Sequence, residues 1–170
     1  MNKAIILNGT LGSGKTTIAR AVNQKVSESV HVEGDGFLWR NPWPKDSNER
    51  CELLLPQLQS IISFWKEQNI KLIVFSYLMP ETFFIKKVES VFEELGFKTS
   101  TFTFFPRKEL LHKRIVERNR MGKPEFEILP ANEMNELLLK QEYVGNKVEV
   151  DELHTVDKIV DIIFRKIEKG

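Results

Sequence analysis

The chain has 170 residues, enough for one domain with a substantial core, whereas two domains would leave each half marginally stable. Its 25 basic and 24 acidic residues nearly cancel, so no global charge draws it to nucleic acid or to an anionic membrane surface. The single cysteine, Cys51, excludes an internal disulfide and favours a reduced, cytoplasmic protein. The apolar run near the amino terminus is too short for a signal sequence or a membrane span. We therefore expect a single domain over residues 1–170 with no membrane partner.

Residues 4–7 form a short apolar run typical of a buried strand, and a glycine-rich segment follows directly. This segment, residues 9–16, matches the phosphate-binding loop pattern, and apolar residues then recur at helical spacing from Ile18 to Val26. Small side chains let backbone N–H groups turn inward around a polyphosphate, while the following helix adds its positive end. The expected nucleotide contacts are Gly9, Thr10, Leu11, Gly12, Ser13, Gly14, Lys15, Thr16 and Thr17.

Two side chains of this loop carry specific chemistry. We expect Lys15 to reach the β- and γ-phosphates of the nucleotide, and the Thr16 hydroxyl to bind the Mg²⁺ that bridges them. A glycine-rich turn that binds nothing is the alternative. The strand before the loop and the helix after it argue against that alternative.

The remaining elements alternate between strand and helix. Strands are expected at residues 30–33, 70–75, 99–105 and 148–150. Helices are expected at residues 53–65, 82–95, 107–120 and 131–143 and from residue 156 onward. A loop rich in aromatic residues and proline is expected at 37–47, a beginning or kink at Pro56, and a polar loop up to Pro130. Without tight hairpin signals, this alternation predicts a three-layer α/β fold with parallel strands.

Ligands of such sheets bind outside the carboxyl ends of the strands, and two carboxylates end the second strand. Asp35 lies where the acceptor of a phosphoryl transfer needs a general base. Glu33 shares its face in an extended chain and could orient Asp35 or contact a magnesium-bound water. Both carboxylates are therefore further candidates for the metal site. The alternative is that Asp35 merely fills a turn, as Asp-Gly pairs often do.

Residues 107–123 hold seven basic side chains against two acidic ones. Arg114 and Arg118 are four residues apart on one helix face, so both can point at the same anion. Guanidinium groups arriving from a mobile flap would neutralise the charge that spreads over the transferred phosphoryl group. Arg114 and Arg118 are therefore expected to be catalytic and Arg120 to bind the nucleotide. A solvated basic face is the alternative.

The loop after the second strand offers candidates for the acceptor. Phe37, Trp39 and Trp43 could stack on an aromatic or sugar-like acceptor, or could cap the core beneath the loop. Arg40 could bind a charged acceptor or simply lie in solvent. The three histidines lack metal-ligand spacing and are interpreted as structural.

On the loop, Asp35 and the basic helix, the chain resembles the small-molecule and nucleotide kinase branch of the P-loop NTPases. That group includes nucleotide, shikimate and gluconate kinases and chloramphenicol phosphotransferase-like enzymes, and the loop is also similar to that of AAA-type ATP-binding proteins. The resemblance implies the sheet order 2-3-1-4-5, ATP as donor, Mg²⁺ as cofactor and a helical lid within about residues 107–130. It also implies that Val150 and Asp151 lie near the adenine.

The chain departs from the pattern of this group in several places. The third strand ends at Ser76 and Tyr77, so the usual Walker B carboxylate is missing. The glycine-rich segment of shikimate kinases, the gluconate kinase stretch after Asp35 and the acceptor motif of adenylate kinases are absent as well. Known acceptors of the group are therefore not indicated.

Together these features predict an ATP-dependent phosphotransferase that acts on a hydroxyl of a small molecule, as a monomer or homodimer. A 5′-hydroxyl kinase for nucleic-acid ends is an alternative, which the neutral net charge disfavours. A regulatory module that binds ATP without transferring phosphate is another, motivated by the missing Walker B carboxylate. The acceptor and the choice between ATP and GTP are left open by the sequence.

Overall fold

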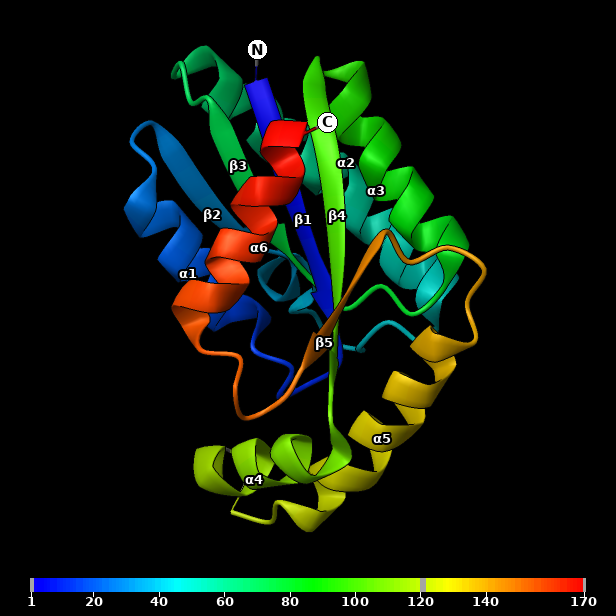
Figure 1. The fold of residues 1–170 in the computed structure, drawn as a ribbon. Helices are drawn as coiled ribbons and strands as arrows, with labels where there is room; N and C mark the ends of the chain where they lie inside the picture. Colours follow the sequence, from blue (N-terminus) through cyan, green and yellow to red (C-terminus); the bar gives the residue numbers. More distant parts are fainter. Residues whose placement is uncertain (1, 120–121, 170) are drawn as a thin grey trace.

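The computed structural model describes residues 2–119 and 122–169, and it has a parallel five-stranded sheet at its centre (Figure 1). The strands are β1 (Asn2–Gly9), β2 (Ser29–Glu33), β3 (Leu72–Ser76), β4 (Phe97–Pro106) and β5 (Asn146–Val150). Their spatial order is β2-β3-β1-β4-β5, and each neighbouring pair is parallel. The expected α/β fold and sheet order are therefore confirmed.

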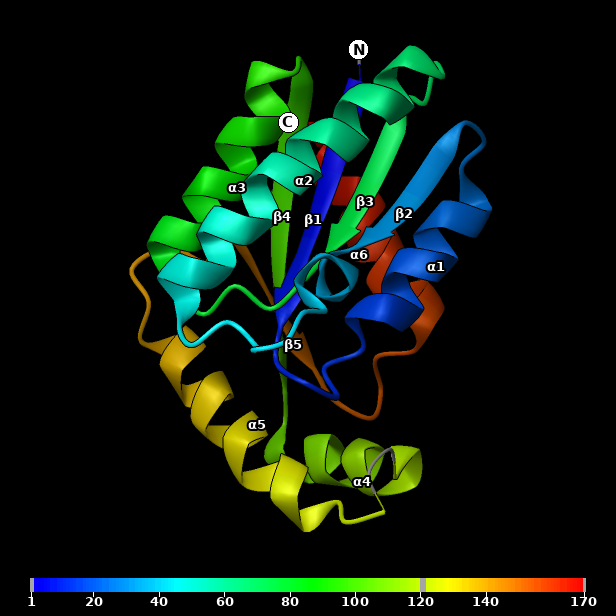
Figure 2. The ribbon, with the colours of Figure 1, turned by 180° about the vertical axis from the view of Figure 1, so that it is seen from behind.

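Helices cover both faces of this sheet. They are α1 (Lys15–Lys25), α2 (Ser47–Glu67), α3 (Thr82–Glu94), α4 (Lys108–Arg118), α5 (Glu125–Leu139) and α6 (Val156–Lys169), with a short 3₁₀ helix, η1 (Gly34–Leu38). Figure 1 shows α1 and α6 in front of the sheet, and Figure 2 shows α2 and α3 on the opposite face. Among the described residues, no helix combines the length and apolar character needed to cross a membrane.

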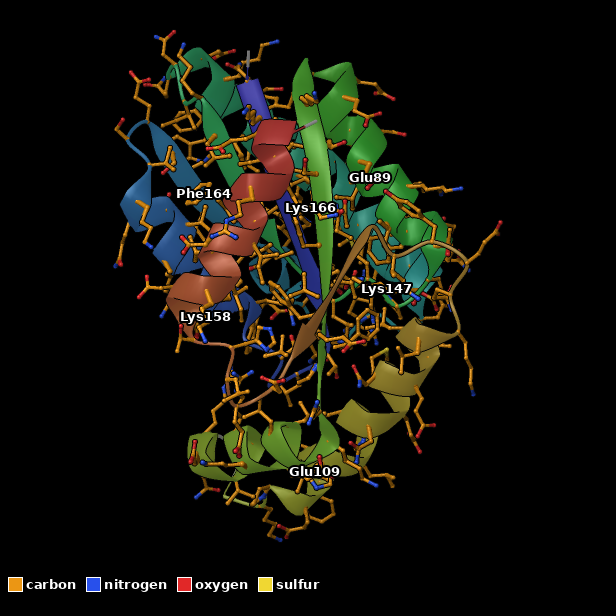
Figure 3. The ribbon with its side chains drawn as sticks, in the orientation of Figure 1. Glu89, Glu109, Lys147, Lys158, Phe164 and Lys166 are labelled. Carbon is orange, nitrogen blue, oxygen red and sulfur yellow. The ribbon has the colours of Figure 1, made fainter. Side chains whose placement is uncertain are left out.

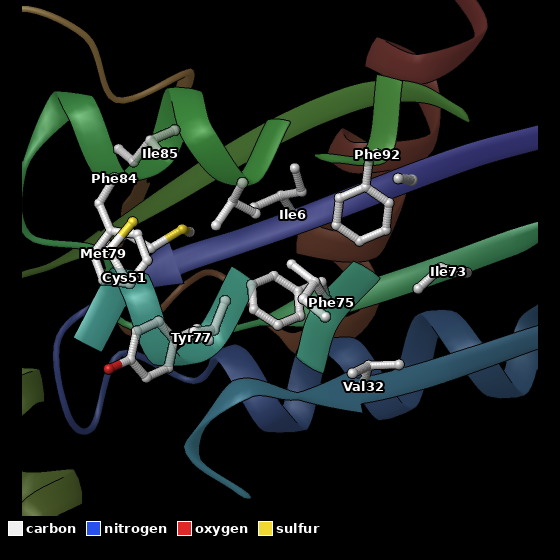
Figure 4. Packing of buried hydrophobic residues seen from close by; sticks show 14 of the residues in the cluster. Ile6, Val32, Cys51, Ile73, Phe75, Tyr77, Met79, Phe84, Ile85 and Phe92 are labelled. Carbon is white, nitrogen blue, oxygen red and sulfur yellow. The ribbon is translucent and has the colours of Figure 1, made fainter. Parts of the chain in front are cut away.

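The core follows from the two-residue period of the central strand. Ile5 and Leu7 of β1 pack with α1 and α6, whereas Ala4 and Ile6 point to the other side, toward α2 and α3. Figure 4 shows Ile6 packed in this second cluster, which has Phe75 and other aromatic rings at its centre. A strand that is buried on both faces is apolar throughout, which is why residues 4–7 could be recognised from sequence.

The outermost helix shows the opposite pattern, because only one of its faces is covered. Ile159, Val160 and Ile163 of α6 are buried against the sheet. Lys158 and Lys166 lie on the exposed face, as Figure 3 shows. This period of three to four residues is what predicted the helix.

Two helices begin earlier than their sequence pattern suggests. α2 starts at Ser47 because Asp46 caps it: its carboxylate accepts a hydrogen bond of 2.9 Å from the backbone N–H of Glu49. α5 starts at Glu125 and contains Pro130, where the sequence predicted a loop. Pro56 lies inside α2 and so does not begin that helix, and Pro130 lies inside α5, so the loop expected up to Pro130 was wrong.

α4 and α5 extend past the carboxyl ends of the strands, away from the two sandwiching layers (Figures 1 and 2). They form a small apolar cluster of their own, in which Leu111, Ile115 and Ala131 are buried and Leu11 of the loop after β1 packs against them. This cluster ties the pair of helices to the phosphate-binding loop. The region expected to be a lid thus lies directly over that loop.

Candidate active site

The loop between β1 and α1 adopts a backbone that only glycine allows at its key positions. Gly9 has φ of +141°, and a Cβ there would lie 3.0 Å from the carbonyl oxygen of Phe104. Gly12 has φ of +76°, and a Cβ there would lie 3.0 Å from Leu111 and 3.1 Å from Ile115 of α4. Backbone conformation and close packing therefore both explain the glycines of this segment.

Lys15, the first residue of α1, folds back over the loop. Its ammonium group donates hydrogen bonds to the carbonyl oxygens of Gly9, at 2.6 Å, and Thr10, at 3.0 Å. Burial lowers the pKa of Lys15 to about 8, although the negative charges of Asp35 and Glu33 act in the opposite direction. The ammonium is thus held at the loop, near two carboxylates.

The buried hydroxyl of Ser13, within the same loop, has no hydrogen-bond partner among the described residues. Buried polar groups rarely stay unpaired, so an unpaired hydroxyl in a glycine-rich loop fits a site that binds a phosphate oxygen. From the lid, Arg114 donates a hydrogen bond of 3.3 Å to the carbonyl oxygen of Ser13. Burial lowers the pKa of this arginine, which nevertheless keeps its positive charge next to the loop.

Thr16 contacts a carboxylate of the neighbouring strand. Its hydroxyl donates a hydrogen bond of 2.7 Å to Oε1 of Glu33, the last residue of β2. Glu33 lies opposite Ser76 in the register of β2 and β3. The end of β3 is where the Walker B carboxylate was missing, so a carboxylate is present one strand away from that position.

A small cavity of about 60 Å³ brings the expected residues together. Its lining residues are Leu11, Gly12, Lys15, Thr16, Glu33, Asp35, Ser76 and Arg118. A larger space of about 500 Å³ shares Thr16, Glu33 and Arg118 with it and adds Thr17, Arg20 and Arg114. The structure thus gathers the loop, the strand-two carboxylates and two lid arginines at the carboxyl ends of β1, β2 and β3. Arg120 lies outside the described residues.

Oxygen donors dominate the place where a metal would bind. The Thr16 hydroxyl and the carboxylates of Glu33 and Asp35 suit Mg²⁺, which takes one or two protein oxygens and completes its shell with water and phosphate. Within residues 2–119 and 122–169, no three histidine, cysteine or acidic side chains form a cage for a metal ion. The donor set therefore fits Mg²⁺ that arrives with a nucleotide, rather than a permanent metal centre.

The contact of His31 with a residue of the small cavity was not predicted from the sequence, which indicated a structural role for this histidine. Its Nε2 atom lies 2.8 Å from the hydroxyl of Ser76, which lines the small cavity. Burial lowers the pKa of His31, so the neutral imidazole is favoured. The adjacency of β2 and β3 brings the two residues together, and no local motif marks that contact.

Asn8, the residue before the loop, was also missed. Its side-chain oxygen accepts hydrogen bonds from the backbone N–H groups of Gly9, at 2.8 Å, and Met79, at 2.9 Å. Its side-chain nitrogen donates to the carbonyl oxygen of Met79 at 3.0 Å. This buried amide therefore connects the phosphate-binding loop with the segment after β3.

The aromatic loop lies on the other side of Asp35. Trp39 is 81% exposed and Trp43 48% exposed, and their rings meet edge to face at 6.3 Å, whereas Phe37 packs partly against the core. Arg40 forms an ion pair of 3.2 Å with Glu49 and donates a hydrogen bond to the carbonyl oxygen of Pro42. The two tryptophans thus present exposed rings, and the charge of Arg40 is compensated.

A third hollow, of about 430 Å³, opens between the start of α4 and the segment after β5. It is lined by Arg107, Glu109, Leu110, Asp151, Glu152 and Leu153. Asp151 accepts a hydrogen bond of 2.9 Å from the N–H of Leu153, and a hydrogen bond from His154 holds the pKa of its carboxyl below the ordinary value. This is the place that the resemblance associates with the adenine.

No protein-family model matches the sequence, and no curated protein matches it either. Solved structures do match, and they show that the fold is P-loop kinase-like. The tunicamycin resistance protein of Deinococcus radiodurans superimposes with a TM-score of 0.72 at 16% identity, over 98% of this chain and 96% of that one.

Two kinases are similar to a comparable degree. A sugar kinase from Janibacter sp. HTCC2649 has a TM-score of 0.72 at 15% identity, over 99% of this chain and 95% of that one. The APS kinase of Mycobacterium tuberculosis, solved with AMPPNP and APS, has a TM-score of 0.65 at 15% identity, over 98% of each chain. At such identities the likeness establishes the fold alone, and the activity has to be argued from the site.

Proposed function

We propose that the protein is an ATP-dependent kinase that transfers the γ-phosphoryl group of Mg-ATP to a hydroxyl of a small molecule. One observation carries this proposal: Lys15, Thr16, Glu33 and Asp35 line a single cavity at the carboxyl ends of three adjacent parallel strands. A lid arginine, Arg118, borders the same cavity. The kinase-like fold supports the assignment, because other proteins of this fold are kinases by name.

On the donor side, the backbone of the loop and the ammonium of Lys15 bind the phosphates. Lys15 exchanges its hydrogen bonds to the carbonyls of Gly9 and Thr10 for phosphate oxygens when ATP binds. Arg114 and Arg118 stabilise the negative charge that builds up on the transferred group, since both border the space next to the loop. The adenine occupies the hollow between Arg107 and Leu153.

Thr16 and Glu33 are the residues that would hold Mg²⁺. Bound there, the ion neutralises the charge that develops on the phosphate oxygens. Glu33 supplies the carboxylate that β3 lacks, because it lies opposite Ser76 and already accepts a hydrogen bond from Thr16. A carboxylate on β2 thus takes the place of Walker B.

On the acceptor side, Asp35 takes the proton from the attacking hydroxyl. The acceptor oxygen forms a bond to the γ-phosphorus while the bond from that phosphorus to the bridging oxygen of ADP breaks. Asp35 is exposed and lies at the start of η1, next to the cavity that contains Lys15. An acceptor can therefore reach it from the side of the aromatic loop.

The test is ADP formation from Mg-ATP across a panel of nucleosides, sugars, antibiotics and 5′-hydroxyl oligonucleotides, with Lys15→Ala as the blank. We expect one chemical class to accelerate ADP release well above that blank. In Asp35→Asn the accelerated rate should fall by about a hundredfold or more while ATP affinity is retained.

Equal rates in Asp35→Asn and the parent protein would refute the assignment of the base. ATP binding with only the blank rate for every acceptor would instead favour a regulatory module that binds ATP without transferring it.

A further inference from the structure

Arg50 lies one turn into α2, on the proposed acceptor side of the site. Among the described residues it forms no ion pair, and its Nε atom is buried without a hydrogen-bond partner. Leaving a buried guanidinium nitrogen unpaired costs stability, so most such groups are paired in native proteins. The buried, unpaired Nε atom is what distinguishes Arg50 from the other described arginines around the site.

Glu49, the residue before Arg50, and Glu81, which contacts the start of α2, both have other partners. Glu49 pairs with Arg40 and accepts a hydrogen bond of 2.9 Å from the backbone N–H of Lys45. Glu81 accepts a hydrogen bond of 3.0 Å from the hydroxyl of Ser47, one turn before Arg50 on α2. Neither Glu49 nor Glu81 forms an ion pair with Arg50 in the described part of the chain.

Tyr77, the first residue after β3, links Arg50 to the general base. Burial raises the pKa of Tyr77 to about 12, a hydrogen bond and the positive charge of Arg50 oppose that rise, and the charge of Asp35 adds to it. The hydroxyl of Tyr77 points out of the apolar cluster in Figure 4. Tyr77 also packs against Gly34, the residue before Asp35, since a Cβ at Gly34 would lie 2.8 Å from the Cβ of Tyr77.

We propose that Arg50 binds an oxyanion of the acceptor, a carboxylate, sulfate or phosphate group, while Asp35 receives its hydroxyl. This proposal rests on the kinase function proposed above and narrows it to hydroxylated acids and phosphorylated alcohols. A guanidinium offers parallel N–H donors that match two oxygens of such a group, and its planar geometry selects that group over a neutral one. It would also offset the repulsion between an anionic acceptor and the carboxylate of Asp35.

Sulfate binding tests the site without requiring catalysis. The protein is first saturated with magnesium and a non-hydrolysable ATP analogue, which occupies the phosphate-binding loop, and sulfate is then titrated in by calorimetry. We expect the parent protein to bind sulfate and Arg50→Met to bind it at least tenfold more weakly. Arg40→Met is the matched control, since it removes a guanidinium that already has a carboxylate partner, and its sulfate affinity should equal that of the parent.

Two further variants separate anion binding from a purely structural role. Tyr77→Phe removes the Tyr77 hydroxyl but keeps the buried ring, so it should retain sulfate binding. Arg50→Lys keeps the charge without the planar fork and should bind sulfate at an intermediate strength. Equal sulfate affinity in Arg50→Met and the parent, whether or not the variant is less stable, would overturn the proposal.

Matched acceptor pairs extend the test to turnover: glycerate against glycerol, gluconate against glucitol, and adenosine monophosphate against adenosine. We expect ADP release to be accelerated only by anionic members, and Arg50→Met to raise their KM at least tenfold. Turnover with neutral members alone would overturn the role of Arg50 and leave the kinase function intact. No turnover with any compound would count against the kinase function, while the sulfate titration would still decide whether Arg50 binds an anion.

Discussion

The two sides of the candidate site differ in the groups that form them, which are backbone on one side and side chains on the other. The donor side consists of backbone, with glycines at fixed positions, a single lysine and α4 packed against the loop. The acceptor side consists of side chains from three separate segments, with Asp35 on η1, Arg50 on α2 and Tyr77 after β3. Backbone geometry leaves a motif in the sequence, whereas side chains that meet only in space leave none. The sequence motif therefore supports a proposal for the donor side, whereas the acceptor has to be found by experiment.

Removing the cation of the donor side should have the largest effect. In Lys15→Met the loop keeps its glycines but loses the charge held over the carbonyls of Gly9 and Thr10. We expect turnover to fall by about a thousandfold, because charge stabilisation at the transferred group is lost. Stopped-flow binding of a fluorescent ATP analogue and steady-state ADP release would measure this. If Arg50→Met lost as much nucleotide binding as Lys15→Met, the division into two sides would be wrong.

A substitution at Glu33, which lies between the donor side and the acceptor side, tests which residue holds Mg²⁺. Glu33→Gln keeps an oxygen for the Thr16 hydroxyl and removes the negative charge. We expect the Mg²⁺ concentration for half-maximal nucleotide binding to rise by about ten- to a hundredfold. The readout is binding of the fluorescent analogue at a series of Mg²⁺ concentrations. Binding in the absence of Mg²⁺ should change little, and an unchanged Mg²⁺ requirement would show that another group carries the ion.

The pKa of Lys15 predicts a pH dependence that belongs to the donor side alone. Only the protonated ammonium attracts phosphate, and in the free protein its pKa is lowered to about 8. ATP affinity should therefore be full below pH 8 and fall as the pH rises above it, by up to about tenfold per pH unit. Calorimetry in buffers of different ionisation enthalpy would detect the proton taken up on binding. Lys15→Arg stays charged and should flatten the profile.

The smallest effect is expected at the exposed edge of the acceptor side. Trp39 is 81% exposed, so Trp39→Ala should leave the melting temperature and the ATP affinity unchanged within error. Its ring would stack on the acceptor, and we expect the KM for the acceptor to rise by about threefold to tenfold. Thermal unfolding and acceptor kinetics would be measured on the same preparation. A large loss of stability would place Trp39 among the core residues instead.

The difference between local sequence signals and contacts formed only in the folded chain also explains which features could be predicted from the sequence. The strands at the centre of the sheet and the residues of the loop were predicted because apolar runs and glycine spacing are local signals. Pro130 was misleading, because a proline inside a helix costs only local hydrogen bonds that packing can offset. The early start of α2 did have a signal, since Asp46 and Glu49 are spaced as a helix cap requires.

Contacts across strands had no such signal. His31 and Ser76 lie forty-five positions apart in sequence, and only the pairing of β2 with β3 brings them together. No motif marks Arg50, and its unpaired Nε and the other partners of Glu49 and Glu81 become visible only in the structure. Residues of this kind can be recognised only when the strand register and the buried face of each helix are known.

The buried amide of Asn8 has a consequence for how this protein can diverge. One side chain holds both the start of the phosphate-binding loop and the backbone of Met79, so a change there disturbs both segments at once. New acceptor preferences should therefore arise in the loop containing Trp39 and Trp43 and on α2, where a single substitution does not disturb the phosphate-binding loop. We expect descendants of this sequence to keep Asn8 together with Lys15 while their tryptophans and Arg50 vary with the molecule they phosphorylate.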